Sequence, residues 1–187
     1  MKIVLYCKDI CKVPADGIIV PVDGSSCELG DTATSRALRD SIIEGQRSEA
    51  YARLKHNVMT IGPIPEGYSR VFEGFGNWKK LIFIAAKPHN GTVSTFSRRH
   101  LYYTLRNSLY RGILAGLTHG LESIAMNVLS HSYLLPSDLA ASCMADVLAI
   151  FRDEPLEIRW CFLAPQRINF FKKICARRNI EWGEACI

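Results

Sequence analysis

Residues 17–22 read Gly17-Ile18-Ile19-Val20-Pro21-Val22, an apolar run rich in β-branched residues. Such a run is typical of a strand that is buried on both faces of a parallel sheet. Later runs of the same character, Leu81-Ile82-Phe83-Ile84-Ala85-Ala86 among them, recur along the chain. We therefore predict strands over residues 3–7, 17–22, 81–86, 123–129 and 157–163.

Helical patterns separate these runs. We predict helices from about Thr32 to Leu54, Ser97 to Thr118, Pro136 to Arg152 and Pro165 to Arg177. The third should begin with a capping Ser137 or Asp138. Glycines and prolines between residues 57 and 78 predict short strands and turns there. Strands that alternate with helices predict an α/β fold, a three-layer α/β/α sandwich with a mixed, largely parallel central sheet. We expect residues 1–187 to form one domain.

Composition narrows the class of protein. The chain has 187 residues, of which 48% are hydrophobic and 22% charged, with a net charge of +5. These values are ordinary for a globular protein, and no run reaches the roughly 20 apolar residues that span a bilayer. The N-terminus has no signal-peptide pattern, so we expect a cytoplasmic location and no membrane. Small basic clusters such as Arg98-Arg99-His100 indicate solvated helix faces, with an anionic ligand or nucleic acid as the alternative.

The cysteines do not indicate a metal site. Seven cysteines occur, an odd number, and none forms a C-x-x-C pair. We expect no structural metal and interpret them as free thiols. The sequence also lacks the G-x-S-x-G, P-loop, H-E-x-x-H and G-x-G-x-x-G motifs, and nothing selects one Cys/His pair as a catalytic dyad.

Ligands of open parallel sheets bind beside the carboxyl ends of the strands, because helix N-termini and loop amides gather there. The loops that follow Cys7, Val22, Leu129 and Leu163 are therefore the candidate site.

Three segments in this order resemble macro domains. Lys8-Asp9-Ile10 resembles the family's Gly-Asp-Ile, and residues 15–26, from Ala15-Asp16-Gly17 to Ser25-Ser26, resemble its Asp-Ala-Ile-Val-Asn-Ala-Ala-Asn-Ser motif. Residues 123–132, from Ser123-Ile124-Ala125 to Ser130-His131-Ser132, are similar to its Ser-Ile-Ala-Phe-Pro-Ala-Ile-Ser-Thr-Gly segment. The chain thus resembles a divergent macro domain, which implies a cleft for ADP-ribose.

The resemblance assigns roles to residues of the first loops. Asp9 would accept a hydrogen bond from the adenine amino group, and Ile10 would lie against the purine. Asp23 would contact the distal ribose and assist attack by water, although a carboxylate cannot donate as the family's asparagine does. Each has a purely structural alternative: Asp9 caps the next turn, Ile10 is core, and Asp23 forms a loop turn.

The phosphate loops depart from the family pattern. The resemblance places the diphosphate against Gly30, Asp31, Ala33, Thr34, Ser130, His131, Ser132 and Tyr133. Of the family's run of glycines only Gly30 remains, and Asp31 would repel a diphosphate; its alternative role, with Thr32, is an ordinary helix N-cap. Leu163 takes the position of an aromatic ring that stacks on adenine. Val20 and Ser35 replace an asparagine and, in some hydrolytic members, an aspartate.

The sequence supports three functions. The first is binding of ADP-ribose or a related NAD-derived nucleotide, with hydrolysis of ADP-ribosyl or O-acetyl-ADP-ribose esters as an associated activity and Asp23 as its catalytic residue. The second is a reader or sensor of ADP-ribosylated protein that lacks catalysis. The third is a scaffold that binds RNA or a protein partner. We expect no cofactor beyond the nucleotide ligand itself.

Overall fold

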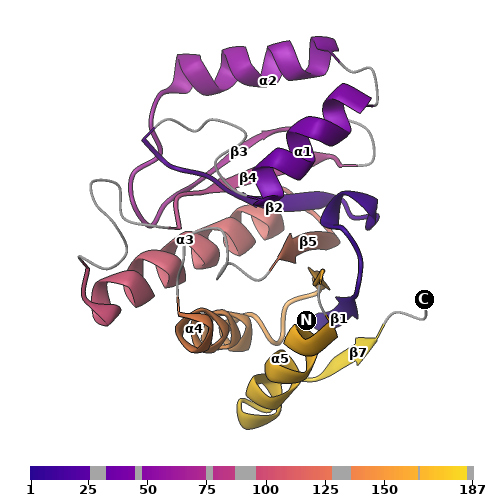
Figure 1. The fold of residues 1–187 in the computed structure, drawn as a ribbon, viewed down its shortest axis with the longest axis vertical. Helices are drawn as coiled ribbons and strands as arrows, with labels where there is room; N and C mark the ends of the chain where they lie inside the picture. Colours follow the sequence, from indigo (N-terminus) through magenta and orange to yellow (C-terminus); the bar gives the residue numbers. More distant parts are fainter. Residues whose placement is uncertain are drawn as a thin grey trace.

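The computed structural model describes residues 1–25, 33–44, 48–74, 78–86, 96–127, 136–163 and 165–184. Within these residues, seven strands form one sheet in the order β3-β4-β2-β5-β6-β1-β7, the middle layer in Figure 1. Their bounds are β1 Lys2–Tyr6, β2 Gly17–Pro21, β3 Ser69–Glu73, β4 Lys80–Ile84, β5 Ser123–Asn127, β6 Glu157–Cys161 and β7 Trp182–Glu184. All five strands that the apolar runs predict are present in this sheet.

The sheet is mixed and largely parallel, as predicted. Strand β3 pairs antiparallel with β4, whereas the other neighbouring strands pair in parallel. The carboxyl ends of the parallel strands therefore lie along one edge of the sheet, here called the carboxyl edge. Strands β2, β5, β6 and β1 are consecutive in the sheet order. The carboxyl ends of these four strands therefore lie next to one another.

Helices cover both faces of the sheet (Figure 1). The bounds on one face are η1 Ile10–Lys12 (a 3₁₀ helix), α1 Ala33–Glu44 and α2 Ser48–Ile61, and on the other α3 Arg98–Thr118, α4 Ser137–Ile150 and α5 Pro165–Arg177. Residues of β2 alternate between the two cores: Ile18 packs in a cluster with Leu38 of α1, and Ile19 packs in a cluster with Ile113 of α3. This alternation follows from the period of two along a strand. The predicted α/β/α sandwich is confirmed.

Asp16 holds the opposite, amino-terminal edge of the sheet together. Its Oδ2 accepts hydrogen bonds from the amides of Glu122 and Ser123, at 2.9 and 3.3 Å, and its Oδ1 lies 2.8 Å from the Nζ of Lys79. Burial raises the pKa of Asp16, but the bonds from Lys79 and the two amides outweigh it and lower the pKa below its usual value. Asp16 therefore joins the starts of β2, β4 and β5.

The predicted helix from Thr32 to Leu54 is wrong, because two helices occupy this region. Helix α1 ends at Glu44 and α2 begins at Ser48. Helix α2 also continues to Ile61, so the first residues of the stretch expected to hold short strands and turns are helical.

Two further expectations are wrong. Residues 157–163 do not supply the last strand, because β7 follows α5 and pairs in parallel with β1; its three exposed residues carry no apolar run. Helix α4 has Pro136 as its N-cap, with no side-chain cap hydrogen bond. Its Asp138 lies in the first turn instead, where it pairs with Arg98 of α3 at 2.6 Å.

Candidate functional site

The first part of the carboxyl edge is the turn that follows β1. Asp9 is the N-cap of η1, and its Oδ1 accepts a hydrogen bond from the amide of Cys11 at 3.0 Å. The structural alternative for Asp9, a cap on the next turn, is thus observed, and its role toward adenine stays a prediction. Ile10 is 2% exposed and packs in a cluster with Val20 and Cys161, so it forms part of the core.

The loop after β2 is fixed by local hydrogen bonds. The Oδ1 of Asp23 accepts from both the amide and the hydroxyl of Ser25, at 3.0 and 2.6 Å, which is the loop turn foreseen as its alternative role. The loop is also tied to its surroundings, because the amide of Ile64 donates to the carbonyl of Gly24 at 2.8 Å. Asp23 is half-buried at the carboxyl edge, and its catalytic role stays a prediction.

The first turn of α1 meets the end of β5 through a polar pair that the sequence did not reveal. The Nδ2 of Asn127 donates to the Oγ1 of Thr34 at 2.8 Å, and Thr34 is 2% exposed. Asn127 follows Ala125 by two residues, and Ala125 faces the core under α1, so alternation directs Asn127 to the same side. Its signal was one amide at the carboxyl end of an otherwise apolar strand. The pair joins the N-terminus of α1 to the centre of the sheet.

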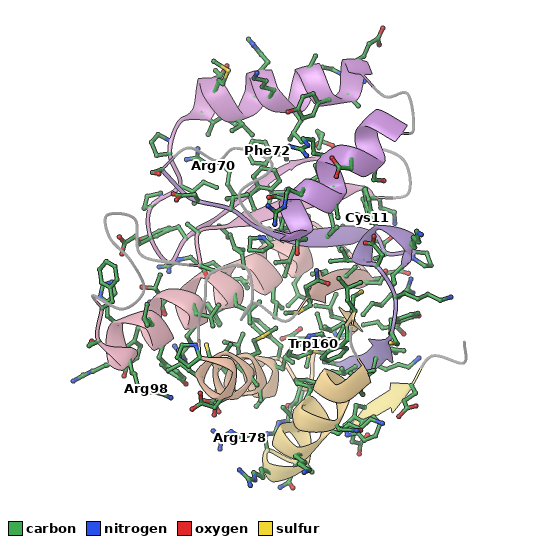
Figure 2. The ribbon with its side chains drawn as sticks, viewed as in Figure 1. Cys11, Arg70, Phe72, Arg98, Trp160 and Arg178 are labelled. Atoms are coloured by element: carbon green, nitrogen blue, oxygen red, sulfur yellow. The ribbon has the colours of Figure 1, made fainter. Side chains whose placement is uncertain are left out.

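Leu163, two residues past the end of β6, differs from its neighbours in exposure. Leu163 lies beyond the end of β6 at Cys161 and is 76% exposed. Trp160 and Phe162 are buried and contact Phe171 of α5, with Trp160 labelled in Figure 2. The period of two along an extended chain accounts for this difference, because the two aromatic rings lie in the core and Leu163 does not. The predicted contact of Leu163 with adenine stays a prediction.

The predicted phosphate loops lie largely outside the described residues. This applies to Gly30 and Asp31 of the first loop and to Ser130, His131, Ser132 and Tyr133 of the second. Ala33 is the first residue of α1, next to the buried Thr34. Helix α1 has no acidic residue in its first turn, so no carboxylate there offsets the positive end of the helix dipole. That turn can attract an anion.

The thiols near the site are poor nucleophiles. Burial, with a smaller effect of the Asp9 carboxylate, raises the pKa of Cys11 to about 12, and burial raises the pKa of Cys161 to about 12 as well. The thiolate is the reactive form of cysteine, so both groups are protonated at neutral pH. Figure 2 labels Cys11 on η1. The geometry thus offers hydrogen bonds and a helix dipole rather than thiol chemistry.

A hollow elsewhere on the molecule does not coincide with this site. It measures about 430 Å³ and is lined by residues that include Asp16, Ser123 and Arg159, which places it at the amino-terminal edge of the sheet. Two of its charged side chains form an ion pair with each other, with the Nε of Arg159 2.7 Å from the Oε1 of Glu157. Among the described residues, no group of three or more metal-ligating side chains could hold an ion, and no helix is long and apolar enough to cross a membrane.

Neither a protein-family model nor a curated protein sequence matches the chain. Solved structures do match it. The macro domain of ganglioside induced differentiation associated protein 2 superposes with a TM-score of 0.74 at 16% identity, over 95% of this chain and 84% of that chain. A mutant of the Oceanobacillus iheyensis macrodomain, solved with ADPR, gives 0.71 at 16% identity over 93% and 91%. The same macrodomain, solved with ADP, gives 0.65 at 15% identity over 91% and 87%.

These matches show which known fold the chain has. Each covers most of both chains at low sequence identity. The chain therefore has the macrodomain fold in a form whose sequence has diverged, as its resemblance to macro domains implied.

Proposed function

We propose that this protein binds ADP-ribose or a related NAD-derived nucleotide at its carboxyl edge. The observation that carries the proposal is the sheet order, which brings the carboxyl ends of β1, β2, β5 and β6 side by side in a macrodomain fold. In such sheets the ligand lies at the carboxyl ends of the strands. The Oceanobacillus macrodomain, which shares this fold, was solved with ADPR and with ADP, and this supports a ligand of the same class here.

Each part of the ligand has a chemically matched partner. The Asp9 carboxylate can accept a hydrogen bond from the adenine amino group, and the Asp23 carboxylate can accept bonds from ribose hydroxyls. The diphosphate would lie at the N-terminus of α1, where the helix dipole and the backbone amides attract anions. The bond between Asn127 and Thr34 supports this arrangement because it fixes that helix end against β5.

Binding without rapid hydrolysis is the form of this function that the residues support best. Val20 and Ser35, which replace polar groups of the family pattern, are both 0% exposed. The Oδ1 of Asp23 already accepts two bonds from Ser25, and a carboxylate does not donate as an amide would. These features support a reader of ADP-ribose or of ADP-ribosylated protein, with ester hydrolysis as the alternative.

The binding proposal is tested by the substitution Asp9→Asn. An asparagine Oδ1 can still cap the turn at Cys11, whereas its amide nitrogen cannot accept a bond from adenine. We expect the variant to melt like the wild type without ligand. The wild type should gain about 2.7 kcal/mol of stability at an ADP-ribose concentration of 100 times Kd, and the variant much less. A wild type whose melting temperature does not change with ADP-ribose or NAD would refute the proposal.

The choice between reader and hydrolase is tested separately. An ADP-ribosylated protein is incubated with the wild type and with Asp23→Ala, and released ADP-ribose is measured. We expect no release above that of a protein-free blank. Release by the wild type that is lost in Asp23→Ala would establish the hydrolase alternative while leaving nucleotide binding intact.

A further inference from the structure

Helix α3 has an unusual charge distribution. Its 21 residues, RRHLYYTLRNSLYRGILAGLT, include four arginines, one histidine and three tyrosines but no aspartate, glutamate or lysine. Arg98 and Arg99 occupy the first turn, where the positive end of the helix dipole disfavours cations by a few tenths of a kcal/mol each. Arg98 is paired with Asp138 of α4 at 2.6 Å, so Arg99 is the residue of this turn whose placement points to a function outside the helix.

One side of α3 carries an ordered set of these residues. Arg99, Tyr103, Asn107 and Arg111 are spaced four residues apart, so they form one continuous row on the helix surface, roughly 18 Å long at 1.5 Å per residue. At its end the Cζ of Arg111 lies 3.9 Å from the ring centre of Tyr68. These four residues and Tyr68 are called the arginine–tyrosine row.

The two tyrosine rings of the row are exposed to solvent, and each lies next to an arginine side chain. Tyr68 is 48% exposed and Tyr103 is 45% exposed. The Cζ of Arg99 lies 5.7 Å from the ring centre of Tyr103. Arg111 also donates to the carbonyl of Gly67 at 2.8 Å, which fixes the turn that carries Tyr68. Two exposed aromatic rings, each next to a guanidinium, are therefore presented along the same row.

The acidic groups nearby already have other partners. Asp138 pairs with Arg98 at 2.6 Å, and Glu66 lies 3.3 Å from the Nε2 of His100. In the part of the chain that the structure describes, neither Arg99 nor Arg111 has a carboxylate within ion-pair distance. The positive charge of the row is thus not neutralised there. Figure 2 marks Arg98 at the N-terminal end of α3, where the row begins.

We propose that the arginine–tyrosine row binds single-stranded RNA. Exposed aromatic rings provide stacking surfaces for unpaired bases, and arginines pair with phosphates and also stack on bases. An acidic peptide would use the charge of the row but not its rings, so the combination favours a nucleic acid. The row lies on a helix that covers the face of the sheet opposite α1 (Figure 1). The row uses none of the residues of the proposed nucleotide site, although Tyr68 lies beside the carboxyl end of β4, where its carbonyl accepts a hydrogen bond from the amide of Ala85.

The test measures fluorescence anisotropy of a labelled oligouridylate of about 15 nucleotides, with the full chain at about 50 mM salt. Tyr103→Leu keeps an apolar side chain and removes the ring, and should weaken binding about fivefold or more. Tyr103→Phe keeps the ring and should bind like the wild type. Arg99→Gln should weaken binding and reduce the slope of log affinity against log salt by about 0.7. The matched control is Lys55→Gln on α2, which removes an exposed charge elsewhere and should change neither value.

Other results would overturn the proposal. It is wrong if the wild type does not bind the oligonucleotide at low salt, or if Tyr103→Leu and Arg99→Gln bind like Lys55→Gln. Displacement of the oligonucleotide by saturating ADP-ribose, together with unchanged binding by Tyr103→Leu, would place the RNA in the proposed nucleotide site and would equally refute the row. A polyaspartate peptide that binds as tightly, without loss in Tyr103→Leu, would show that the row recognises charge alone.

Discussion

Three aspartates near the start of the chain have different roles because their hydrogen-bond partners differ. Asp16 receives two backbone amides and a lysine from other strands, and these lower its pKa. Asp9 and Asp23 accept bonds from residues only two positions ahead. The long-range bonds of Asp16 make it a structural residue at the amino-terminal edge. The local bonds of Asp9 and Asp23 hold two carboxylates at the opposite edge, where the ligand of a parallel sheet binds.

The pair formed by Thr34 and Asn127 leads to a prediction at the scale of single residues. Thr34→Val keeps the shape of the side chain but removes the acceptor for the Asn127 amide. We expect a loss of about 1–2 kcal/mol in the free energy of unfolding, because a half-buried donor loses its partner. If the nucleotide site is correct, affinity for ADP-ribose should also fall, since α1 is no longer tied to β5. Urea unfolding and ligand-dependent melting measure the two effects.

The control for this substitution is Thr60→Val on α2, where the threonine hydroxyl donates to its own helix at His56 and is exposed. That change should alter stability by less than about 0.5 kcal/mol. Equal losses in the two variants would show that the contact with Asn127 contributes nothing.

Among the elements, α3 owes its position to two small residues that face the sheet. A methyl group added at Gly116 would lie 2.3 Å from the Cδ1 of Ile124, and one at Gly112 would lie 2.9 Å from the Cγ2 of Ile84. Both isoleucines are 0% exposed, so neither can move into solvent. The glycines let the helix backbone approach β4 and β5 closely.

Gly116→Val should therefore destabilise the protein by about 2 kcal/mol, because overpacking outweighs the gain in helix propensity over glycine. The matched control is Thr118→Val, an exposed position in the last turn of the same helix. In the background of Ile124→Ala, Gly116→Val should lower the free energy of unfolding by less than it does in the wild type, because the side chain that it would clash with is gone. Additive effects of the two substitutions in urea unfolding would contradict this account of the packing.

The elements that the sequence predicted best are those with long and continuous patterns. The last helix was predicted from Pro165 to Arg177 and is observed with those bounds. The long helix α3 begins one residue after its predicted start, because Ser97 is its N-cap. The three-residue strand β7 was missed because its exposed residues gain stability from pairing with β1, a contact that no local pattern encodes.

The same distinction applies to the candidate site. Asp9 and Asp23 could be selected from the sequence because the segments that contain them resemble macro domains and each lies just past a predicted strand. The link between Asn127 and Thr34 could not, because 93 positions separate the two residues. Such a contact is created by the strand order, which places β5 beside β2.

At the scale of the whole molecule, the two cores enclose most of the thiols that the structure describes. Burial raises the pKa values of Cys11, Cys143, Cys161 and Cys175 from 9.0 to about 12. An unfolded chain would ionise these thiols near pH 9, whereas the folded chain keeps its protons until about pH 12. Their contribution to stability is therefore complete below pH 9 and is lost as the pH rises from 9 toward 12.

This linkage predicts that the protein is labile to alkali. Each buried thiol should lower the free energy of unfolding by an amount on the order of 1 kcal/mol per pH unit in that window. Urea unfolding between about pH 7 and pH 10 should show a flat region followed by a steep decline. Cys143→Ala, which removes a fully buried group, should lower stability at neutral pH and make the decline shallower, whereas the exposed Cys7→Ala should change neither. A decline of equal steepness in wild type and Cys143→Ala would show that the buried thiols do not control it.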